Sequence, residues 1–363
     1  MIVVPIKEMF DDPLHLESGE VLPGFEIVFE IYGELAPERD NAILICHGLT
    51  SDHHAAGRHR EDDPKPGWWD GAIGPGKPFD TDRFCIISSN VIGGFGGSSG
   101  PASSNPRTGK PYAMGFPVVT IADMVSAQAR LADRLGIKRF HTVAGGCMGG
   151  FQVLEWLVQH PARLANALVI SATALVSAHT IALWKVMREA ICRDPNWRGG
   201  DYYDHSPPVD GIAFGAMVGA LFWMSRDVMA ARFGTRIIED KNPAYTFEAD
   251  FEIEAFMNQI AEGAASRIDP NGLMYSMRAM DYFDMTRGRE NLAEAFSNTT
   301  ARSLLVSYGS DWRYPSSEME EIHQAIKSAG ASCEHKILKS DFGHGAFIYD
   351  FEGLGPVIRD FLS

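Results

Sequence analysis

The sequence predicts an α/β fold in which a mostly parallel central sheet carries an inserted helical lid. Short apolar segments rich in isoleucine and valine alternate with segments of helical periodicity, and glycine or proline marks their boundaries. A long stretch rich in methionine, alanine and tryptophan then interrupts this alternation. Strands that alternate with helices are typical of a parallel sheet covered on both faces. We therefore expect an α/β core in two parts, 1–173 and 298–363, with a helical lid over 174–297.

Seven apolar segments are interpreted as buried strands. They run over 24–35, 41–49, 83–94, 139–146, 166–173, 301–311 and 332–340. Helices are expected over 120–135, whose apolar residues fall largely on one face, and over 316–330. Inside the lid, helical periodicity runs over 174–191, 210–224 and 251–268. Because the α/β alternation resumes after the lid, we expect one interrupted unit rather than two separate domains.

The composition is that of an ordinary globular protein. The chain has 363 residues, of which 45% are hydrophobic and 22% charged, and this excludes a disordered or coiled-coil chain. Its 47 acidic and 32 basic residues give a net charge of −15, so phosphate backbones and anionic lipid surfaces would repel it. No apolar stretch reaches the roughly 18 residues of a membrane span. We expect small-molecule substrates, and neither nucleic acid nor a membrane as a partner.

The five cysteines favour a reducing compartment. They are Cys46, Cys85, Cys147, Cys192 and Cys333. An odd number without CxxC spacing fits neither a disulfide framework nor a structural zinc site. The expected location is therefore the cytoplasm.

The segment that carries the chemistry is the sequence GGCMGG over 145–150. It lies directly between an apolar strand and an amphipathic helix, and this arrangement matches the G-x-S-x-G nucleophile elbow of α/β-hydrolases with cysteine in the serine position. Glycines are needed there because neighbours with a Cβ would collide with the flanking strands. The following helix N-terminus favours an anion and would lower the pKa of the thiol. We therefore expect Cys147 to be a nucleophile rather than a buried structural cysteine.

An elbow nucleophile requires a base and an acid, which follow it along the chain in the order acid, histidine. Asp311 comes at the carboxyl end of a predicted strand, and His344 lies between two glycines after the next strand. His344 would accept the proton, and Asp311 would hold its tautomer. Asp341 is a rival acid, but its position three residues before His344 is unfavourable for this geometry. An oxyanion hole is expected from the backbone N–H groups of Leu49 and Met148.

A metal site is the alternative interpretation of four clustered histidines, His47, His53, His54 and His59. His53 and His54 are adjacent and point apart on any regular element, and no acidic residue has the register of an HExxH motif. We therefore expect no metal and no permanently bound cofactor.

Long blocks of sequence resemble the homoserine O-acetyltransferase family of α/β-hydrolase-fold acyltransferases. These blocks are HGLT, GWWDGAIGPGKPFDTDRF, SNVIGGFGGSSGPASSNPRTGKPY, FPVVTIADMV, GGCMGGFQVLEW, DPNWRGGDYY, RAMDYFDM, SDWRYP and GHGAF. The resemblance covers nearly the whole chain. It implies ping-pong transfer of an acyl group from acyl-CoA through an acyl-enzyme, with acetyl as the expected acyl group, and it implies a homodimer formed through lid helices.

Three positions depart from the pattern of the family. Cys147 replaces the usual serine, and Gly345 replaces an aspartate that resembles the partner of the acceptor's amino group. Arg188 matches the arginine implied to bind the acceptor carboxylate, but Trp184 replaces an asparagine four residues earlier. Asp281 is a candidate to replace the missing ammonium partner. The expected acceptor is homoserine or a relative held without the same amine contact.

Three functions remain open from the sequence. The first is an acyltransferase that forms a Cys147 thioester from acyl-CoA and passes the acyl group to a hydroxyl acceptor. The second is an esterase, thioesterase or lactonase in which water resolves the same acyl-enzyme. The third, a binding protein without chemistry, is disfavoured because Cys147, Asp311 and His344 are all present.

Overall fold

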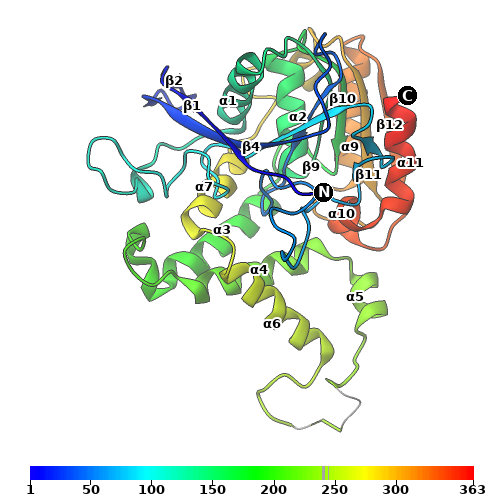
Figure 1. The fold of residues 1–363 in the computed structure, drawn as a ribbon. Coiled ribbons are helices and arrows are strands. Elements are labelled where there is room, and N and C mark those ends of the chain that lie inside the picture. The colour runs from blue at the N-terminus through cyan, green and yellow to red at the C-terminus, as the bar shows by residue number, and fades with distance from the viewer. Residues whose placement is uncertain (239–241, 244) are drawn as a thin grey trace.

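The computed structural model describes residues 1–238, 242–243 and 245–363, and it confirms the predicted α/β fold. Its central sheet has eight strands in the order β1-β4-β8-β5-β9-β10-β11-β12 (Figure 1). The strand β4 pairs antiparallel with both β1 and β8, and the six strands from β8 to β12 are parallel to one another. The predicted, mostly parallel sheet is therefore present.

The strands coincide with the seven predicted apolar segments, with one addition. In chain order they are β1 Ile6–Phe10, β4 Phe25–Tyr32, β5 Ala42–Cys46, β8 Cys85–Ser89, β9 Phe140–Gly146, β10 Leu164–Ile170, β11 Arg302–Tyr308 and β12 Cys333–Leu338. Two further pairs of short strands are β2 Leu14–His15 with β3 Val21–Leu22, and β6 Ile73–Gly74 with β7 Phe79–Asp80. The sequence analysis missed β1, because an exposed edge strand lacks the continuous apolar run of the buried strands.

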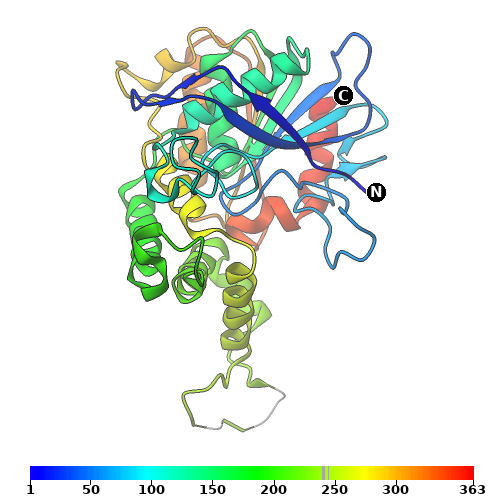
Figure 2. The same ribbon diagram turned by 60° about the vertical axis from the view of Figure 1, so that its left-hand side comes forward.

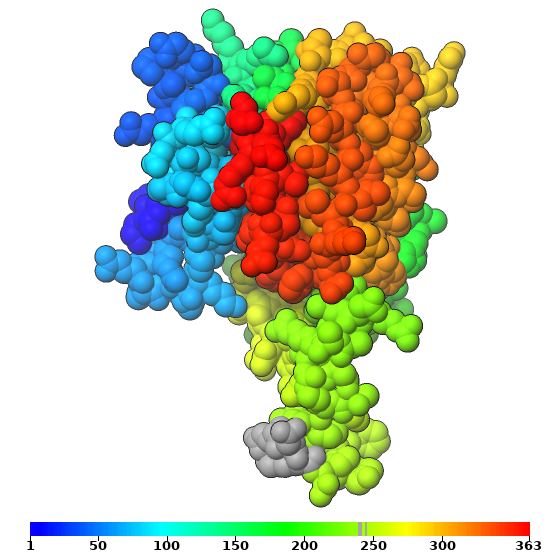
Figure 3. All heavy atoms as spheres, turned by 90° about the vertical axis from the view of Figure 1, so that its right-hand side faces the viewer, coloured from blue at the N-terminus to red at the C-terminus, as the bar shows by residue number. Residues whose placement is uncertain are grey.

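Helices cover both faces of the sheet. They are α1 Ile121–Arg134, α2 Met148–Gln159, α9 Ser316–Ser328, α10 Ala346–Tyr349 and α11 Phe351–Leu362. In Figure 1, α11 lies at the right of the strands, away from α1 and α2, and Figure 3 shows it, in red, on the surface of that side. The helix α1 begins where the sequence predicts, because Thr120 and Asp123 accept hydrogen bonds from each other's backbone N–H groups in a capping box.

The inserted helices lie between β10 and β11 along the chain, and α3 to α6 project from one end of the sheet (Figure 2). The inserted helices are α3 Ala178–Arg193, α4 Val209–Trp223, α5 Arg226–Arg232, α6 Glu252–Ala265, α7 Pro270–Asp281 and α8 Leu292–Ala295. Single 3-10 turns span Ala113–Gly115, Pro195–Gly200 and Gly343–Gly345. Within the predicted lid, positions 239–241 and 244 lie outside the described residues.

The helix α7 belongs to the packed core rather than to the projecting lid. Ten of its residues are buried, and Tyr275 donates a hydrogen bond to the backbone oxygen of Met114, 3.0 Å away. A Cβ at Gly272 would lie 2.9 Å from the backbone oxygen of Gly94, so only glycine permits this close approach. The helical excursion therefore returns to the sheet before β11.

No single described helix is long and apolar enough to cross a membrane. The pair α4 and α5 meets the length and composition of a span only when taken together, and the two helices are bent by 102° at their junction.

The close packing of the elbow predicts a strong effect of adding one methyl group. A Cβ at Gly149 would lie 2.1 Å from the backbone oxygen of Cys46, at the point where α2 leaves the elbow and meets β5. We expect Gly149→Ala to lower the free energy of unfolding by about 1–3 kcal/mol, measured by urea denaturation, because neither backbone segment can yield easily. The matched control is Gly263→Ala in α6, where a Cβ would meet no atom within 4 Å. An unchanged midpoint for Gly149→Ala would contradict this packing.

Candidate active site

Cys147 lies at the junction between β9 and α2, at the carboxyl edge of the sheet. Its backbone has φ 58° and ψ −127°, a conformation that costs energy for any residue with a Cβ. The backbone N–H of Cys147 is fixed by a 3.1 Å hydrogen bond to the oxygen of Ile170, and its carbonyl accepts from Gly150. The strained residue is thus held by bonds to β10 and to the first turn of α2.

The structure brings Asp311 and His344 together beside Cys147. The Nδ1 atom of His344 lies 2.9 Å from Oδ2 of Asp311, and both side chains are buried. The other carboxylate oxygen of Asp311 accepts from the backbone N–H groups of Arg313 and Tyr314 at 3.0 and 3.1 Å. The rival Asp341 is exposed and makes no contact with His344 within the described chain. The acid that orients the imidazole in this structure is therefore Asp311.

The charges of these three groups stabilise one another. Burial alone would raise the pKa of the Cys147 thiol, but the neighbouring imidazole of His344 lowers it to about 7. Burial would lower the pKa of His344, but Asp311 and Cys147 raise it to about 9. Burial would raise the pKa of Asp311, and His344 instead holds it below its usual value. Between about pH 7 and pH 9 the site therefore favours a thiolate beside an imidazolium.

The second ring nitrogen of His344 is available for proton transfer. Nε2 is buried on the side of the Cys147 thiol, whose hydrogen bond to the imidazole contributes to raising the pKa of His344, whereas Nδ1 is committed to Asp311. With Nδ1 held by a carboxylate, a proton gained or lost by the ring passes through Nε2 on the side of the thiol. This geometry suits a general base and acid.

Lid residues pack against the loop that carries His344. A Cβ at Gly343 would lie 2.6 Å from the backbone nitrogen of Ser225, and Gly343 has a φ of +62°. A Cβ at Gly345 would lie 3.1 Å from the indole ring of Trp223, at the end of α4. The hydroxyl of Ser225 also donates to the backbone oxygen of Asp341. The lid therefore holds the histidine loop directly, and Trp223 stands where a side chain at position 345 would begin.

The two predicted oxyanion donors, Leu49 and Met148, flank the thiol. Gly48 lies beside the nucleophile, since a Cβ there would be 3.7 Å from the Cβ of Cys147. The N–H of Met148 forms a backbone hydrogen bond to Cys147 that contributes to lowering the pKa of the thiol, and the N–H of Leu49 donates no hydrogen bond within the described chain. His47 fixes this loop, because its Nδ1 lies 2.8 Å from the oxygen of Gly48 and its Nε2 accepts from the N–H of Val91 at 3.1 Å. Burial lowers the pKa of His47, which keeps the ring neutral.

Arg188, expected to bind an acceptor carboxylate, is paired with an acid in this structure. Its Nη2 lies 2.7 Å from Oδ2 of Asp281. Nη1 of Arg188 and Oδ1 of Asp281 are both buried without a hydrogen-bond partner among the described residues. The pair therefore retains one free donor and one free acceptor.

Three further residues near the thiol escaped the sequence analysis. Trp223 contacts the histidine loop, and Arg313 and Tyr314 follow Asp311 directly. The charge of Arg313 contributes to lowering the pKa of Cys147, and the hydroxyl of Tyr314 is buried without a partner within the described chain. Their position beside Asp311 was the only sequence signal for Arg313 and Tyr314, whereas Trp223 reaches the site through tertiary packing alone.

The histidine cluster gathers on an acidic residue that lies far away in sequence. Glu30, from the centre of β4, accepts from Nδ1 of His54 at 3.1 Å and from Nε2 of His59 at 2.6 Å. Tyr32 also donates to Glu30. The sequence argument considered only acids in the HExxH register, and Glu30 lies outside it. A second group of this kind consists of Glu320, His323 and His335. In both groups, hydrogen bonds between carboxylate and imidazole account for the arrangement.

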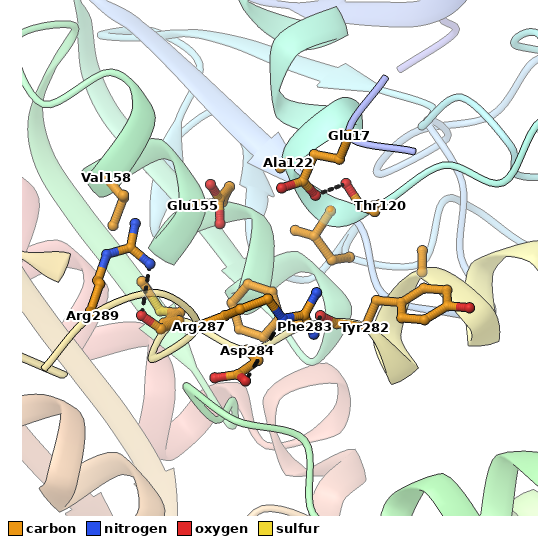
Figure 4. A pocket seen from close by; sticks show the side chains of 13 residues that line it. Glu17, Thr120, Ala122, Glu155, Val158, Tyr282, Phe283, Asp284, Arg287 and Arg289 are labelled. Carbon is orange, nitrogen blue, oxygen red and sulfur yellow. Dashed lines mark hydrogen bonds and ion pairs between the residues drawn. The ribbon is translucent and has the colours of Figure 1, made fainter. Parts of the chain in front are cut away.

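A surface pocket elsewhere is separate from these residues. It lies between the start of α1, the side of α2 and the segment after α7 (Figure 4). Its lining includes Glu17, Glu155, Arg287 and Arg289, and none of the residues expected to act in catalysis. The acidic and basic side chains that line this pocket give no further indication of a functional site.

Comparisons with known proteins agree with this fold. A family model described as alpha/beta hydrolase fold matches residues 41–351. A homoserine O-acetyltransferase of Geotalea daltonii is 43% identical over 354 residues, which cover 98% of this chain and 96% of that protein. A homoserine O-succinyltransferase of Acidithiobacillus ferrooxidans is 40% identical over 364 residues, with 100% of this chain and 95% of that protein covered.

Two solved structures extend the comparison. A homoserine O-acetyltransferase from Bacillus anthracis matches with a TM-score of 0.91 and 28% identity, covering 100% of this chain and 98% of that chain. A structure named esterase E22 matches with a TM-score of 0.88 and 28% identity, covering 99% of this chain and 100% of that chain. The same scaffold therefore occurs in proteins named transferase and in proteins named esterase.

The contact between Trp223 and Gly345 predicts a coupled pair of substitutions. We expect Gly345→Asp alone to lower the free energy of unfolding by about 1–3 kcal/mol, because the new side chain meets the indole ring. In a Trp223→Ala background, the same Gly345→Asp change is expected to cost less than about 0.5 kcal/mol. The measurement is a double-mutant cycle by urea denaturation. Additive effects of the two changes would contradict the proposed contact.

Proposed function

The chain belongs to the homoserine O-acyltransferase family of α/β-hydrolase-fold proteins, and from this membership we propose an acyl transfer in two half-reactions through a thioester at Cys147. The observation that carries the proposal is a buried thiol that lies beside an imidazole bonded to a carboxylate and beside the backbone N–H of Met148. The acyltransferase activity follows from the family. The cysteine nucleophile, the residue roles and the acyl-CoA donor are our proposals.

In the first half-reaction, the Cys147 thiolate attacks the carbonyl carbon of an acyl-CoA thioester. The negative charge that develops on the carbonyl oxygen is stabilised by the N–H groups of Leu49 and Met148. The bond between the carbonyl carbon and the sulfur of CoA then breaks, and CoA leaves with the proton from Nε2 of His344. The products are free CoA, a Cys147 thioester and a neutral imidazole.

In the second half-reaction, an acceptor hydroxyl replaces CoA. His344 takes the hydroxyl proton at Nε2 while the acceptor oxygen attacks the thioester carbonyl, and the same oxyanion hole acts again. Collapse of the tetrahedral intermediate releases the ester product and the Cys147 thiolate. The imidazolium of His344 then faces the thiolate once more, so the starting charges are restored. Asp311 stabilises the imidazolium in both half-reactions through its bond to Nδ1.

The Arg188 and Asp281 pair is our proposed site for the acceptor. Its unpaired Nη1 and Oδ1 atoms complement the carboxylate and the ammonium of an amino acid. Asp281 would supply the amine contact that Gly345 no longer provides, since Trp223 packs where that side chain would project. A hydroxy amino acid such as homoserine is the acceptor class that fits these two groups. The donor is a short acyl-CoA, and no resident cofactor takes part.

Hydrolysis is the second candidate function. The observation that favours it is the match to esterase E22, which shares the fold at the same identity as the matched acetyltransferase structure. In this case water, rather than an acceptor hydroxyl, would resolve the Cys147 thioester. The two functions use the same residues in the first half-reaction. They differ in the molecule that attacks the Cys147 thioester in the second.

We also propose a homodimer formed through the lid, in the cytoplasm. Phe214 and Leu221 lie seven residues apart on one face of α4 and are 56% and 49% exposed. Neighbouring exposed apolar side chains on one face are typical of an interaction surface. A thiol nucleophile also requires a reducing compartment, which favours the cytoplasm.

Intact-protein mass spectrometry tests the covalent intermediate. Incubation with acetyl-CoA or succinyl-CoA is expected to add one acyl group, mapped to Cys147 and lost in Cys147→Ala but kept in Cys333→Ala. His344→Ala is expected to slow acylation by roughly 10²–10⁴-fold, because a positioned proton donor and acceptor is removed. An intact adduct in Cys147→Ala would exclude the proposed nucleophile.

The same preparation separates transfer from hydrolysis. A transferase discharges the adduct faster when homoserine or another hydroxy amino acid is added, and it releases the acylated acceptor. Discharge at one rate in buffer, whatever acceptor is present, would identify a hydrolase.

Light scattering tests the proposed dimer. The unaltered chain is expected to have twice the mass of the 39.9 kDa chain, and a double substitution of Phe214→Glu and Leu221→Glu is expected to give monomers. The matched control is Ile337→Glu on the edge strand β12, which is equally apolar and exposed but lies away from α4. A monomeric unaltered chain would contradict this assembly.

A further inference from the structure

Three histidine rings surround the buried carboxylate of Glu30. Glu30 lies on β4 and is 0% exposed. Its oxygens lie 3.1 Å from Nδ1 of His54 and 2.6 Å from Nε2 of His59. Nε2 of a third ring, that of His53, lies 3.8 Å from Oε1 of Glu30. One carboxylate from β4 and three imidazoles from the loop over 53–59 therefore converge on one place.

Hydrogen bonds account for His54 and His59, but they do not account for His53. The side chain of His53 is only 10% exposed, and neither of its ring nitrogens has a hydrogen-bond partner among the described residues. A buried imidazole with two unsatisfied nitrogens is costly, because water no longer solvates them. Burial also lowers the pKa of His53, so the ring is neutral and one nitrogen lone pair is free. A cation that accepts this lone pair would remove part of the cost.

The four side chains suit a divalent transition-metal ion such as Zn²⁺. Imidazole nitrogen and carboxylate oxygen are among its usual ligands, and a structural site has four ligands in a tetrahedron. Bonds of about 2.0–2.1 Å place the ligand atoms of such a tetrahedron about 3.3 Å apart. The ligand atoms of Glu30, His54 and His59 all lie within 4.8 Å of one another. With Nε2 of His53 at 3.8 Å from Glu30, small movements of the side chains would complete the tetrahedron.

Neighbouring groups hold these side chains in place. The hydroxyl of Tyr32 donates to Glu30 and accepts from two backbone N–H groups of the histidine-bearing loop, at 2.9 and 3.1 Å. Asp52 and Asp63 accept from the backbone N–H groups of the two hydrogen-bonded histidines, at 2.9 and 3.0 Å. Outer hydrogen bonds of this kind commonly orient metal ligands. The two aspartates also provide the negative charge that a divalent ion needs beyond Glu30.

The second group of one carboxylate and two imidazoles lacks these features. Glu320 is 48% exposed, and both ring nitrogens of His335 already have partners at 2.8 Å, namely Glu320 at Nδ1 and Ser307 at Nε2. Hydrogen bonds therefore satisfy His335, whereas they leave His53 unsatisfied. This difference favours the cluster around Glu30 as the metal site.

We propose that Glu30, His53, His54 and His59 form a structural site for a divalent transition-metal ion, with Zn²⁺ as the expected occupant. The ion replaces the protons that the rings of His54 and His59 share with Glu30, and these protons pass to solvent. The side chain of His59 is 39% exposed, which gives the ion a path from solvent. The bound ion joins β4 to the loop that follows Leu49. Because these ligands take no part in the proposed acyl transfer, the inference is independent of it.

Metal binding by the unaltered chain is the first test. The protein carries no histidine tag and is freed of metal with a chelator. Competition with a chromogenic chelator is expected to show one tightly bound Zn²⁺ per chain, and Co²⁺ is expected to give the intense visible absorption of a tetrahedral site. Failure to compete for Zn²⁺, or the weak absorption of octahedral Co²⁺, would overturn the inference. This test does not depend on the folding of any variant.

Substitution of the ligands locates the ion. His59→Gln is expected to weaken Zn²⁺ binding at least about 100-fold, because losing a ligand exceeds the roughly 10–100-fold cost of losing an outer partner. His53→Gln is expected to weaken binding at least about 10-fold and to reduce the absorption of Co²⁺. The matched control is His205→Gln, an exposed histidine outside both groups, which is expected to leave binding unchanged. Unchanged binding in His53→Gln would overturn the four-ligand site.

Two further variants exclude other places for the ion. Both Cys147→Ala and His335→Gln are expected to keep the full affinity for Zn²⁺. Loss of the ion from Cys147→Ala would place it at the thiol, and loss from His335→Gln would place it at the second group; either result would overturn the inference. Zn²⁺ is also expected to raise the Tm of the unaltered chain and not that of His59→Gln, which shows that the variant folds.

The outcomes for the metal site and for the proposed function are distinguishable. One Zn²⁺ bound through the histidines, without an acyl adduct on Cys147, would support the metal site and refute the thioester. An acyl adduct on Cys147 in a chain that binds no Zn²⁺ would support the thioester and overturn the metal site.

Discussion

The positive groups that face Cys147 favour a thiolate in this buried site. Burial opposes the charge, and the imidazolium of His344 together with the guanidinium of Arg313 outweighs that penalty. His344 in turn keeps its proton because Asp311 holds Nδ1 at 2.9 Å. Three features keep these charged groups close together. They are the strained backbone at Cys147, the loop after β11 that holds Asp311, and the packing of Trp223 on the histidine loop. The nearby positive charges therefore suit a cysteine in a position normally filled by serine, because a thiol ionises much more easily than a hydroxyl.

The lid does more than cover the sheet. Trp223 and Ser225 pack directly on the histidine loop, and Trp184 on α3 carries the ring over which Arg313 lies. Movement of the lid would therefore change the position of His344 and the surroundings of Arg313 together. Three departures from the family pattern, at Cys147, Trp184 and Gly345, meet in this one region. We interpret them as related changes in how the two substrates are held.

Much of the fold and part of the site could be predicted from sequence, because those features are local. Six of the seven predicted strands are largely buried and appear as short apolar runs, and the elbow at Cys147 lies within six consecutive residues. The seventh, β12, was expected to be buried, but it lies at the edge of the sheet and has no buried residue. Asp311 and His344 could be named because each follows a strand at the edge where parallel strands end. The edge strand β1 was missed because its exposed residues carry no such run. The partners Glu30, Trp223 and Asp281 depend on contacts between distant segments, which no local pattern encodes. The positive charge of Arg313 was visible in the sequence, but its effect on the Cys147 thiol appears only once the chain is folded.

The measurement that tests the central claim most directly is the ultraviolet absorbance of the thiolate as a function of pH, taken as the difference between the unaltered protein and Cys147→Ser. The account predicts one thiolate that forms with a midpoint of about 7, and a higher midpoint in both His344→Ala and Arg313→Leu. A midpoint at or above the ordinary thiol value of 9.0 in the unaltered protein would contradict the account. In that case the site would hold a neutral thiol, and the charges around it would need another explanation.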